Sequence, residues 1–286
     1  MFQYMRLADH FIEVDWTEAL RQGGLHAGSL TSATAASGVG WGMDLLLSDV
    51  HLRGLQDPNQ DLLVQLLRAE DWGRVFVLGD LFHFWWGHDG QVSAQFVPVL
   101  AALHACAAAG CQVHFIPGNH DFAVGAGLEK LGIQVAQELR VHLAGHATLL
   151  AHGDQADLSL GYRGASRVLR SLPFAVLMRL LGPTRGAKLG SRLAADHEGG
   201  GSERILQAQK VWAETNFGPG CRLVVCGHSH TPGLHKLSNG ALLNLGDVAH
   251  SQSCAIVDHA GIWPCVIREG RPVPTGPHLP ARDRSL

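Results

Sequence analysis

The sequence contains no CxxC pair among its six cysteines and no secretory-signal pattern. The N-terminus lacks a basic start followed by an apolar core, which a signal peptide requires. Disulfide frameworks are typical of small secreted domains, whereas this chain has 286 residues. We therefore expect reduced cysteines and a cytoplasmic protein.

Long apolar runs and a strong net charge are also missing. The most apolar helical run, 172–181, is short and contains Pro173 and Arg179, so no segment reaches the roughly 20 residues of a membrane-spanning helix. The formal net charge of −3 gives no general basic footprint for nucleic acid. We expect neither a membrane-spanning protein nor a nucleic-acid partner.

Alternating strands and helices begin at Met43. Residues 23–42 are rich in Gly, Ser, Thr and Ala without periodicity, so we interpret 1–42 as a disordered extension or as an over-read before a start at Met43. Strands are expected at 45–47, 75–78, 113–116, 141–143, 148–151 and 223–226. Helices are expected at 57–70, with Asp57 as N-cap and Pro58 at the first helical position, and at 91–109, ended by Gly110. Asn239-Gly240 predicts a hairpin turn, and 255–257 and 262–267 predict a last hairpin. The Pro-rich tail, 271–286, is expected to be loose.

Residues 156–217 interrupt this alternation. They read as helices with many arginines, few acids and bulky apolar residues such as Phe174, Leu177 and Met178. Because strands resume afterwards, we expect a helical cap inserted into a core formed by 43–155 and 218–270. An ordinary amphipathic lid whose arginines face water is the alternative.

Five loops that follow predicted strands carry histidine, aspartate or asparagine. They are Ser48-Asp49-Val50-His51, Gly79-Asp80, Gly118-Asn119-His120-Asp121, Ala151-His152-Gly153-Asp154 and Gly227-His228-Ser229-His230. Ligands of α/β sheets bind just beyond the carboxyl ends of the strands. A single strand-end Asp is often only a helix cap, but five such loops in one chain indicate a metal site. The high count of histidine, 18 residues, agrees with this interpretation.

The residue types indicate two metal ions. Two neighbouring cations repel each other, so a carboxylate must bridge them, and Asp80 stands alone at a strand end where it could do so. Mixed imidazole and oxygen ligation favours Mn²⁺, Fe²⁺ or Zn²⁺ over Mg²⁺ or Ca²⁺, and we expect Mn²⁺ first. Such a pair lowers the pKa of a water to give a hydroxide and holds phosphoryl oxygens for in-line attack.

The series D-x-H, G-D, G-N-H-D, H-G-D and G-H-S-H resembles the calcineurin-like metallophosphoesterase superfamily over nearly all of 43–267. The resemblance implies an α/β fold, a four-layer β-sandwich flanked by helices. It implies that one metal ion is held by Asp49, His51, Asp80 and His230, and the other by Asp80, Asn119, His152 and His228. It also implies that His120, oriented by Asp121, stabilises or protonates the leaving group.

Further features resemble one branch of that superfamily, the UDP-2,3-diacylglucosamine pyrophosphohydrolases of lipid A biosynthesis. They are the aromatic run after Asp80, the segment 243–247 and the helical insertion. The resemblance implies a nucleotide-lipid substrate, cleavage to UMP and lipid X, and peripheral attachment to the cytoplasmic face of the inner membrane. The residues implied to contact substrate are Asn119, His120, Asp157, Tyr162 and Arg163. Many members of the branch carry Arg at the position of His120, so a changed or broader substrate stays open.

Two alternatives remain. A hydrolase of the same fold that acts on another phosphodiester, phosphomonoester or nucleotide would share the metal ligands but would not need an apolar cap. A metal-free scaffold of this fold would have lost ligand residues, whereas every ligand position is filled in this sequence. The sequence fixes neither the oligomeric state nor the length of the acyl chains.

Overall fold

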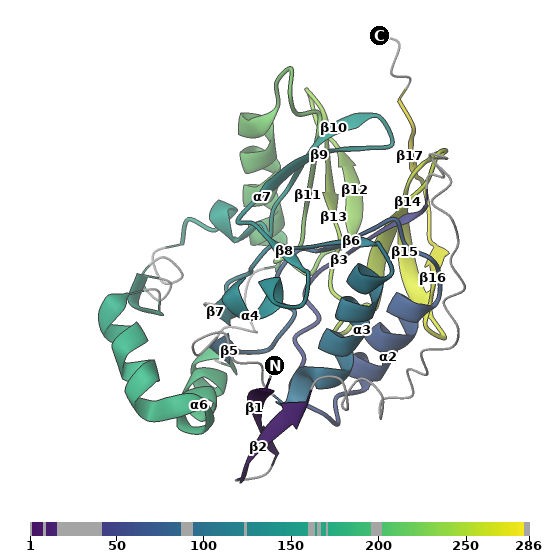
Figure 1. Ribbon diagram of the computed structural model, residues 1–286. Coiled ribbons are helices and arrows are strands. Elements are labelled where there is room, and N and C mark those ends of the chain that lie inside the picture. Colours follow the sequence, from purple (N-terminus) through teal and green to yellow (C-terminus); the bar gives the residue numbers. More distant parts are fainter. Residues whose placement is uncertain are drawn as a thin grey trace, which may run out of the picture.

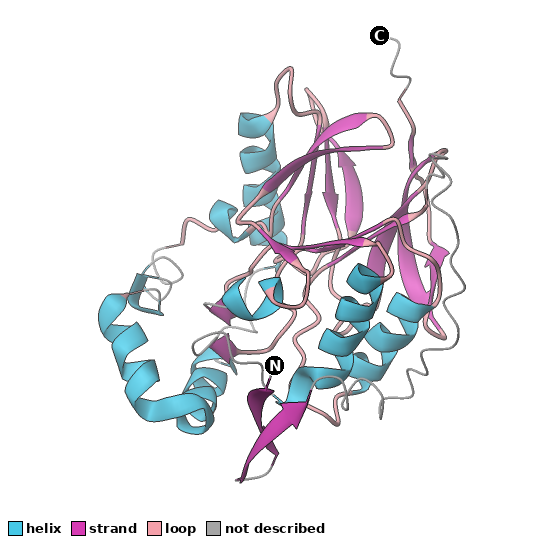
Figure 2. Cartoon of the chain, in the orientation of Figure 1, coloured by secondary structure: helices cyan, strands magenta, loops and turns pink. Residues whose placement is uncertain are grey.

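The computed structural model describes residues 2–7, 10–15, 42–86, 94–122, 125–159, 164, 167–169, 171–195 and 202–282. Two twisted sheets lie face to face, with helices outside them (Figures 1 and 2). The larger sheet has the order β16-β15-β14-β3-β4-β6-β8, with β17 paired to β15, and the smaller has the order β12-β13-β11-β10-β9.

The strands of the larger sheet are β3 (Asp44–Leu47), β4 (Arg74–Val77), β6 (Gln112–Phe115), β8 (Gln134–Val135), β14 (Ser253–Val257), β15 (Gly261–Arg268), β16 (Arg271–Pro274) and β17 (Leu279–Pro280). Those of the smaller sheet are β9 (Leu139–Leu143), β10 (His146–Leu150), β11 (Leu223–Cys226), β12 (Gly233–Lys236) and β13 (Ala241–Asn244). Two short pairs are formed by β1 (Phe2–Leu7) with β2 (His10–Asp15), and by β5 (Trp85–Trp86) with β7 (Asp121–Phe122).

The helices are α2 (Pro58–Arg68), α3 (Val97–Ala108), α4 (Gly125–Glu129), α6 (Leu172–Ala195) and α7 (Ser202–Asn216), with single 3-10 turns η1 (Ala94–Phe96) and η2 (Asp154–Ala156). The sequence signals at the start of α2 are confirmed. Asp57 is its N-cap and accepts a hydrogen bond from the Asn59 amide at 3.0 Å, and Pro58 occupies the first turn.

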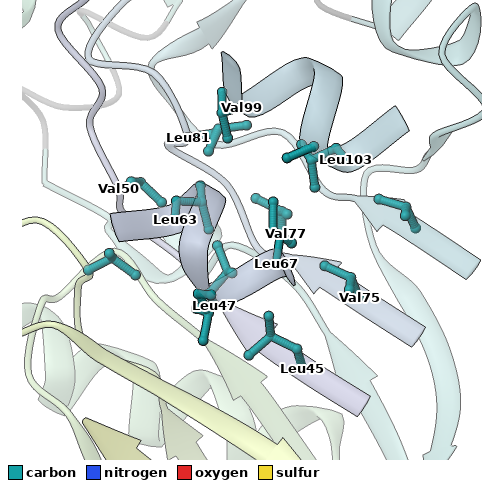
Figure 3. Packing of buried hydrophobic residues seen from close by; sticks show 14 of the residues in the cluster. Leu45, Leu47, Val50, Leu63, Leu67, Val75, Val77, Leu81, Val99 and Leu103 are labelled. Carbon is teal, nitrogen blue, oxygen red and sulfur yellow. The ribbon is translucent and has the colours of Figure 1, made fainter. Parts of the chain in front are cut away.

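Alternate residues of the central strands point into different cores. Leu45 and Leu47 of β3 pack against α2 and α3 (Figure 3), while Leu46 packs between the two sheets. In β11, Val225 faces the same inter-sheet core and Val224 faces α7. Each fully buried aliphatic side chain stabilises the fold by about 1.5–3 kcal/mol relative to exposure. The layers are therefore helix, sheet, sheet and helix, which confirms the expected four-layer sandwich.

The inserted segment divides into two parts with different roles. Helix α6 stands to one side of the sheets (Figure 1) and is kinked at Gly182, where φ is 70°. Helix α7 instead packs on the smaller sheet, because Leu206 and Ala213, seven residues apart on one face, are buried there. The second half of the expected cap is therefore a layer of the core. Within the described residues, no helix is both long and apolar enough to cross a bilayer.

Both chain ends differ from expectation. The prediction of a loose tail is wrong for 271–280. Glu269 and Gly270 adopt left-handed backbone conformations and turn the chain back, so that β16 pairs with β15. Pro272 and Pro274 are tolerated in β16 because it is an edge strand. Residues 2–15 hold a hairpin, so the prediction of disorder is wrong for β1 and β2, whose aromatic and β-branched residues favour strands. The rest of that prediction, 16–41, lies outside the described residues.

Candidate metal centre

The five loops singled out from the sequence meet at one rim of the sandwich. Strands β3, β4 and β6 run parallel to one another, and so do β10 and β11, so their carboxyl ends lie together. Backbone hydrogen bonds connect the loops directly. The Asp49 amide donates to the Gly79 carbonyl at 3.0 Å, and the Gly227 amide donates to the His152 carbonyl at 2.9 Å. The fold therefore holds the loops in fixed positions relative to one another.

One group of ligand atoms consists of Asp49, His51 and His230, all within 4.8 Å of one another. Asp49 Oδ1 lies 3.1 Å from His230 Nε2 and 3.8 Å from His51 Nε2, and the two imidazole nitrogens are 3.4 Å apart. Asp49 is fully buried. A buried carboxylate oxygen facing two imidazole nitrogens suits a cation placed among them.

A second group consists of Asp80, His152 and His228. His152 Nδ1 lies 2.8 Å from the Leu78 carbonyl oxygen, which can only accept, so this nitrogen carries a proton. The other nitrogen, Nε2, then points toward Asp80 Oδ2 at 3.3 Å and Asn119 Oδ1 at 3.1 Å. A histidine fixed in this tautomer is prepared to bind a metal through Nε2.

Asp80 lies between the two groups. Its Oδ2 is 3.3 Å from His152 Nε2 on one side and 4.0 Å from His51 Nε2 on the other. Its Oδ1 accepts a hydrogen bond from the His120 amide at 2.9 Å, which fixes the rotation of the carboxylate. The structure thus brings together all seven side chains expected to hold metal, namely Asp49, His51, Asp80, Asn119, His152, His228 and His230.

The backbone at the centre adopts a conformation that non-glycine residues rarely use. Five of the seven positions have positive φ between 50° and 64°, namely Asp49, His51, Asp80, His228 and His230. Asp and His adopt this geometry more readily than most residues, but it still costs free energy, and five such positions persist together only where the surrounding structure enforces them. The fold therefore holds these residues in a costly backbone conformation that orients their side chains as ligands.

Two glycines let the loops approach this closely. A Cβ atom at Gly118 would collide with Asp80 Oδ1, and one at Gly227 would collide with Asp49 Oδ2. Unlike Gly79, these two glycines do not have φ angles in the left-handed range. Glycine is therefore needed at both positions because the carboxylates lie so close to the backbone, and not because of turn geometry. The glycines that precede Asn119 and His228 in the sequence motifs are thus required by packing against the carboxylates.

The charges of the centre suit metal binding. Burial lowers the pKa of both His51 and His228 to about 4, so both imidazoles are neutral near pH 7. Burial alone would raise the pKa of Asp80, but His152 and His120 hold it well below its usual value, so Asp80 is an anion.

The carboxylates act in the opposite direction on the other two histidines. Despite burial, Asp247 and Asp49 raise the pKa of His230 to about 10, and Asp80 raises the pKa of His152 well above its usual value, so a divalent cation would displace a proton from each. The residues present therefore fit divalent metal ions.

His120 borders the centre, although Asp121 does not orient its ring as expected. His120 Nε2 is 3.9 Å from Asp80 Oδ2, and its Nδ1 lies 2.8 Å from the carbonyl oxygen of His83. Asp121 instead accepts hydrogen bonds from the amides of Asp80 at 2.7 Å and Gly118 at 3.1 Å. Burial and the neighbouring Asp80 raise the pKa of Asp121 to about 7. The Asp121 carboxylate therefore fixes the backbone of the loops that carry Asp80 and Gly118, while the His83 carbonyl oxygen orients the His120 ring.

Asp247 is a contributor that the sequence motifs did not indicate. It is 3% exposed, and its Oδ2 lies 3.4 Å from His230 Nδ1 and 2.9 Å from His250 Nδ1. Its Oδ1 accepts a hydrogen bond from the Ser251 amide at 2.8 Å, which holds the carboxylate in place. Asp247 follows β13, which runs parallel to β11 and therefore ends at the same rim. That parallel pairing is the signal that could have identified it.

We expect Asp247→Ala to weaken metal binding by about 10–100-fold, the usual cost of losing a carboxylate that orients a metal-binding histidine. Without this acceptor, His230 is free to rotate and to take the other tautomer. Titration with Mn²⁺ in the presence of a competing chelator measures the affinity, and Asp71→Ala, at an exposed loop position, is the control. Unchanged affinity in Asp247→Ala would show that His230 is oriented without it.

The remaining predicted substrate contacts are less defined. Asp157 is buried at 9% exposure, but its Oδ1 accepts a hydrogen bond from the Ser159 amide at 2.9 Å and lies 3.8 Å from the Arg204 guanidinium. These contacts give Asp157 a turn-forming role, and its contact with substrate stays a prediction. Tyr162 and Arg163 lie outside the described residues.

Comparison with known proteins shows the family of this chain. The model of the calcineurin-like phosphoesterase family matches residues 45–232. The UDP-2,3-diacylglucosamine hydrolase of Xanthomonas axonopodis pv. citri is 30% identical over 238 residues, covering 76% of this chain and 96% of that protein. The UDP-2,3-diacylglucosamine hydrolase of Aeromonas salmonicida is 29% identical over 206 residues, covering 68% of this chain and 80% of that protein. The solved structure of YfcE, a phosphoesterase from E. coli, is 15% identical and covers 84% of this chain and 100% of that one, with a TM-score of 0.45. The chain belongs to the calcineurin-like phosphoesterase family.

Proposed function

We propose that this chain hydrolyses the pyrophosphate bond of UDP-2,3-diacylglucosamine to give UMP and 2,3-diacylglucosamine 1-phosphate, lipid X. The observation that carries the proposal is a complete set of seven candidate metal ligands beside an apolar helical insertion. Relatives named for this reaction, at about 30% identity and up to 96% coverage of their length, support the same substrate.

In this proposal, Asp49, His51, Asp80 and His230 hold one divalent cation, and Asp80, Asn119, His152 and His228 hold the other. Two such ions, when bound, lower the pKa of a coordinated water and polarise the phosphoryl oxygens. The mixture of imidazole, carboxylate and amide ligands favours Mn²⁺, with Fe²⁺ or Zn²⁺ as alternatives. The central place of Asp80, 3.3 Å from His152 and 4.0 Å from His51, supports its role as the shared ligand.

His120 is proposed to act on the leaving group. Its Nδ1 is held by the His83 carbonyl oxygen, so Nε2 is the nitrogen that faces the centre. A positioned imidazole there can donate a proton or a hydrogen bond to the departing phosphate oxygen. Asp121 serves this step indirectly, because it holds the amide of Asp80 and thereby the loop that carries the shared ligand.

Helix α6 is proposed to receive the acyl chains and to contact the cytoplasmic membrane surface. Phe84 and Phe122, which follow His83 and Asp121, pack with Phe174 and Met178 and so connect the metal rim to α6. Of the nine large apolar side chains that the described residues expose, six lie within 158–180, including Leu172 at 77% and Leu180 at 81%. Arg167, Arg179, Arg185 and Arg192 are exposed in the same region. Apolar side chains with adjacent arginines suit acyl chains and anionic headgroups.

A product assay tests the proposal. Protein loaded with Mn²⁺ is incubated with UDP-2,3-diacylglucosamine in detergent micelles, and UMP and lipid X are quantified together. We expect equimolar release of both, abolished by a chelator and restored by Mn²⁺. If neither product is released while bis(4-nitrophenyl) phosphate is hydrolysed, the two-metal chemistry stands but the substrate is another phosphodiester.

A further inference from the structure

A cavity of about 760 Å³ with a mixed polar and apolar lining opens beside the metal centre. Its walls are the β3–α2 loop, with Arg53 and Gln56, the start of α2 with Asn59, the β13–β14 loop with His250, and Gln95 of η1. His51, one of the candidate ligands, forms its inner end. The volume lies in the range of small-molecule sites, roughly 300–1,000 Å³. Of the seven candidate metal ligands, His51 alone belongs to its lining.

The walls of the cavity are preorganised. The Asp57 carboxylate accepts hydrogen bonds from the amide of Arg53 at 2.9 Å and from the amide of Asn59 at 3.0 Å, which fixes the β3–α2 loop. The Asn59 side chain donates to the Ala249 carbonyl at 3.2 Å and so ties this loop to the opposite wall. A cavity whose two walls are joined by hydrogen bonds does not have to form when a ligand arrives, which lowers the cost of binding.

The two approaches to the metal centre differ in chemistry. On the side of His120, Phe84 and Phe122 lead to Phe174 of α6, so that approach is apolar. On the side of His51, the lining combines three amides (Gln56, Asn59 and Gln95) with the charged Arg53 and Asp57 and with the apolar Leu55, Pro58 and Ala249. Figure 1 shows α2, which begins at the cavity, well separated from α6. A substrate whose reacting phosphates sit at the metals would therefore extend one end into each environment.

We propose that this cavity binds the nucleoside monophosphate end of the substrate. The inference rests on the proposed function, since it assumes a nucleotide joined to a lipid through a pyrophosphate. A pyrimidine base offers both donors and acceptors along its edge, and the amides of Gln56 and Gln95 can match either kind. Arg53 lines the same cavity as His51, and its guanidinium can bind the phosphate or ribose that enters from the metals.

The test uses the full-length, Mn²⁺-loaded protein with the variants Arg53→Gln and Gln95→Leu, and with Arg140→Gln, an exposed position on β9, as the matched control. Arg53→Gln should raise the KM for UDP-2,3-diacylglucosamine and the inhibition constant of UMP about tenfold, as expected for one charge-assisted hydrogen bond. Gln95→Leu should raise the same KM and inhibition constant by a smaller factor. For Arg53→Gln, the rise in KM for UDP-2,3-diacylglucosamine should be several times larger than the rise in KM for bis(4-nitrophenyl) phosphate, which has no nucleoside.

The outcomes separate the subsite from the reaction. If the wild-type protein hydrolyses the UDP-lipid while both variants keep its KM and the UMP inhibition constant, the proposed function stands and the subsite is wrong. If the wild-type protein does not hydrolyse the UDP-lipid, the proposed function fails, and calorimetry with UMP alone decides the subsite. UMP binding that Arg53→Gln weakens and Arg140→Gln does not would then retain the subsite, and absence of UMP binding would overturn it.

Discussion

Asp80→Ala is expected to abolish metal-dependent turnover, with a loss of at least about 10³-fold, while the protein remains folded. Asp80 is 1% exposed and lies between the two ligand groups, so its removal leaves each group without the carboxylate that they share. The His120 amide also loses its acceptor, Asp80 Oδ1. Metal content by elemental analysis and turnover of a generic phosphodiester measure the effect.

Asp71→Ala, at an exposed position just before β4, is the control for that substitution and should keep both metal and activity. Circular dichroism tests whether the Asp80 variant is folded, which we expect because the core around β3 and β4 consists of apolar side chains. Full residual turnover in Asp80→Ala would contradict the two-metal assignment. Loss of only one metal equivalent with partial activity would show that Asp80 belongs to one ion rather than to both.

His120→Ala is expected to slow turnover by about 10²–10⁴-fold, the usual contribution of a positioned acid or base, while the metal content stays intact. The imidazole is 8% exposed and held through Nδ1 by the His83 carbonyl, so its role depends on Nε2. Because the step concerns the leaving group, the defect should be smaller for substrates whose leaving group is a weak base, such as 4-nitrophenolate. The comparison of kcat for the two substrate types measures this.

His142→Ala, an exposed histidine on β9, is the matched control and should leave kcat unchanged. If His120→Ala lost metal in proportion to activity, His120 would be a ligand and its proposed role would be wrong. That result would have a structural basis, because the Nε2 atoms of His120 and His51 and the carboxylate of Asp80 form a third group within 4.8 Å. Metal analysis is therefore as important as kinetics for this variant.

The local part of the fold could be predicted because five strands are short apolar runs, each followed by a loop with metal-binding side chains. Asp49, Asp80 and His152 were identified since they directly follow β3, β4 and β10, and parallel pairing brings those ends together. The α2 boundary was predicted from Asp57 and Pro58, which act within one turn. These signals depend only on residues that are neighbours in the chain.

What the sequence did not reveal depends on contacts between distant residues. Asp247 acts through His230, seventeen positions earlier, and its loop reaches the rim only because β13 pairs with β11. The Asp121 carboxylate binds the amide of Asp80, forty-one positions away, although the G-N-H-D motif suggested a partner next to it. Gln209 of α7 donates to the Gly227 carbonyl at 2.8 Å, so α7 supports a ligand loop that no local pattern connects to it.

The left-handed backbone at five ligand positions also sets how this protein can change over time. Each such residue costs of order 1–3 kcal/mol, whereas the whole domain is stable by only about 5–15 kcal/mol. Glycine at Asp49, Asp80 or His230 would relax the chain and remove a ligand in the same step. Substitutions that relieve this strain are therefore expected to stabilise the fold at the expense of metal binding. The ligands persist only as long as turnover itself is selected.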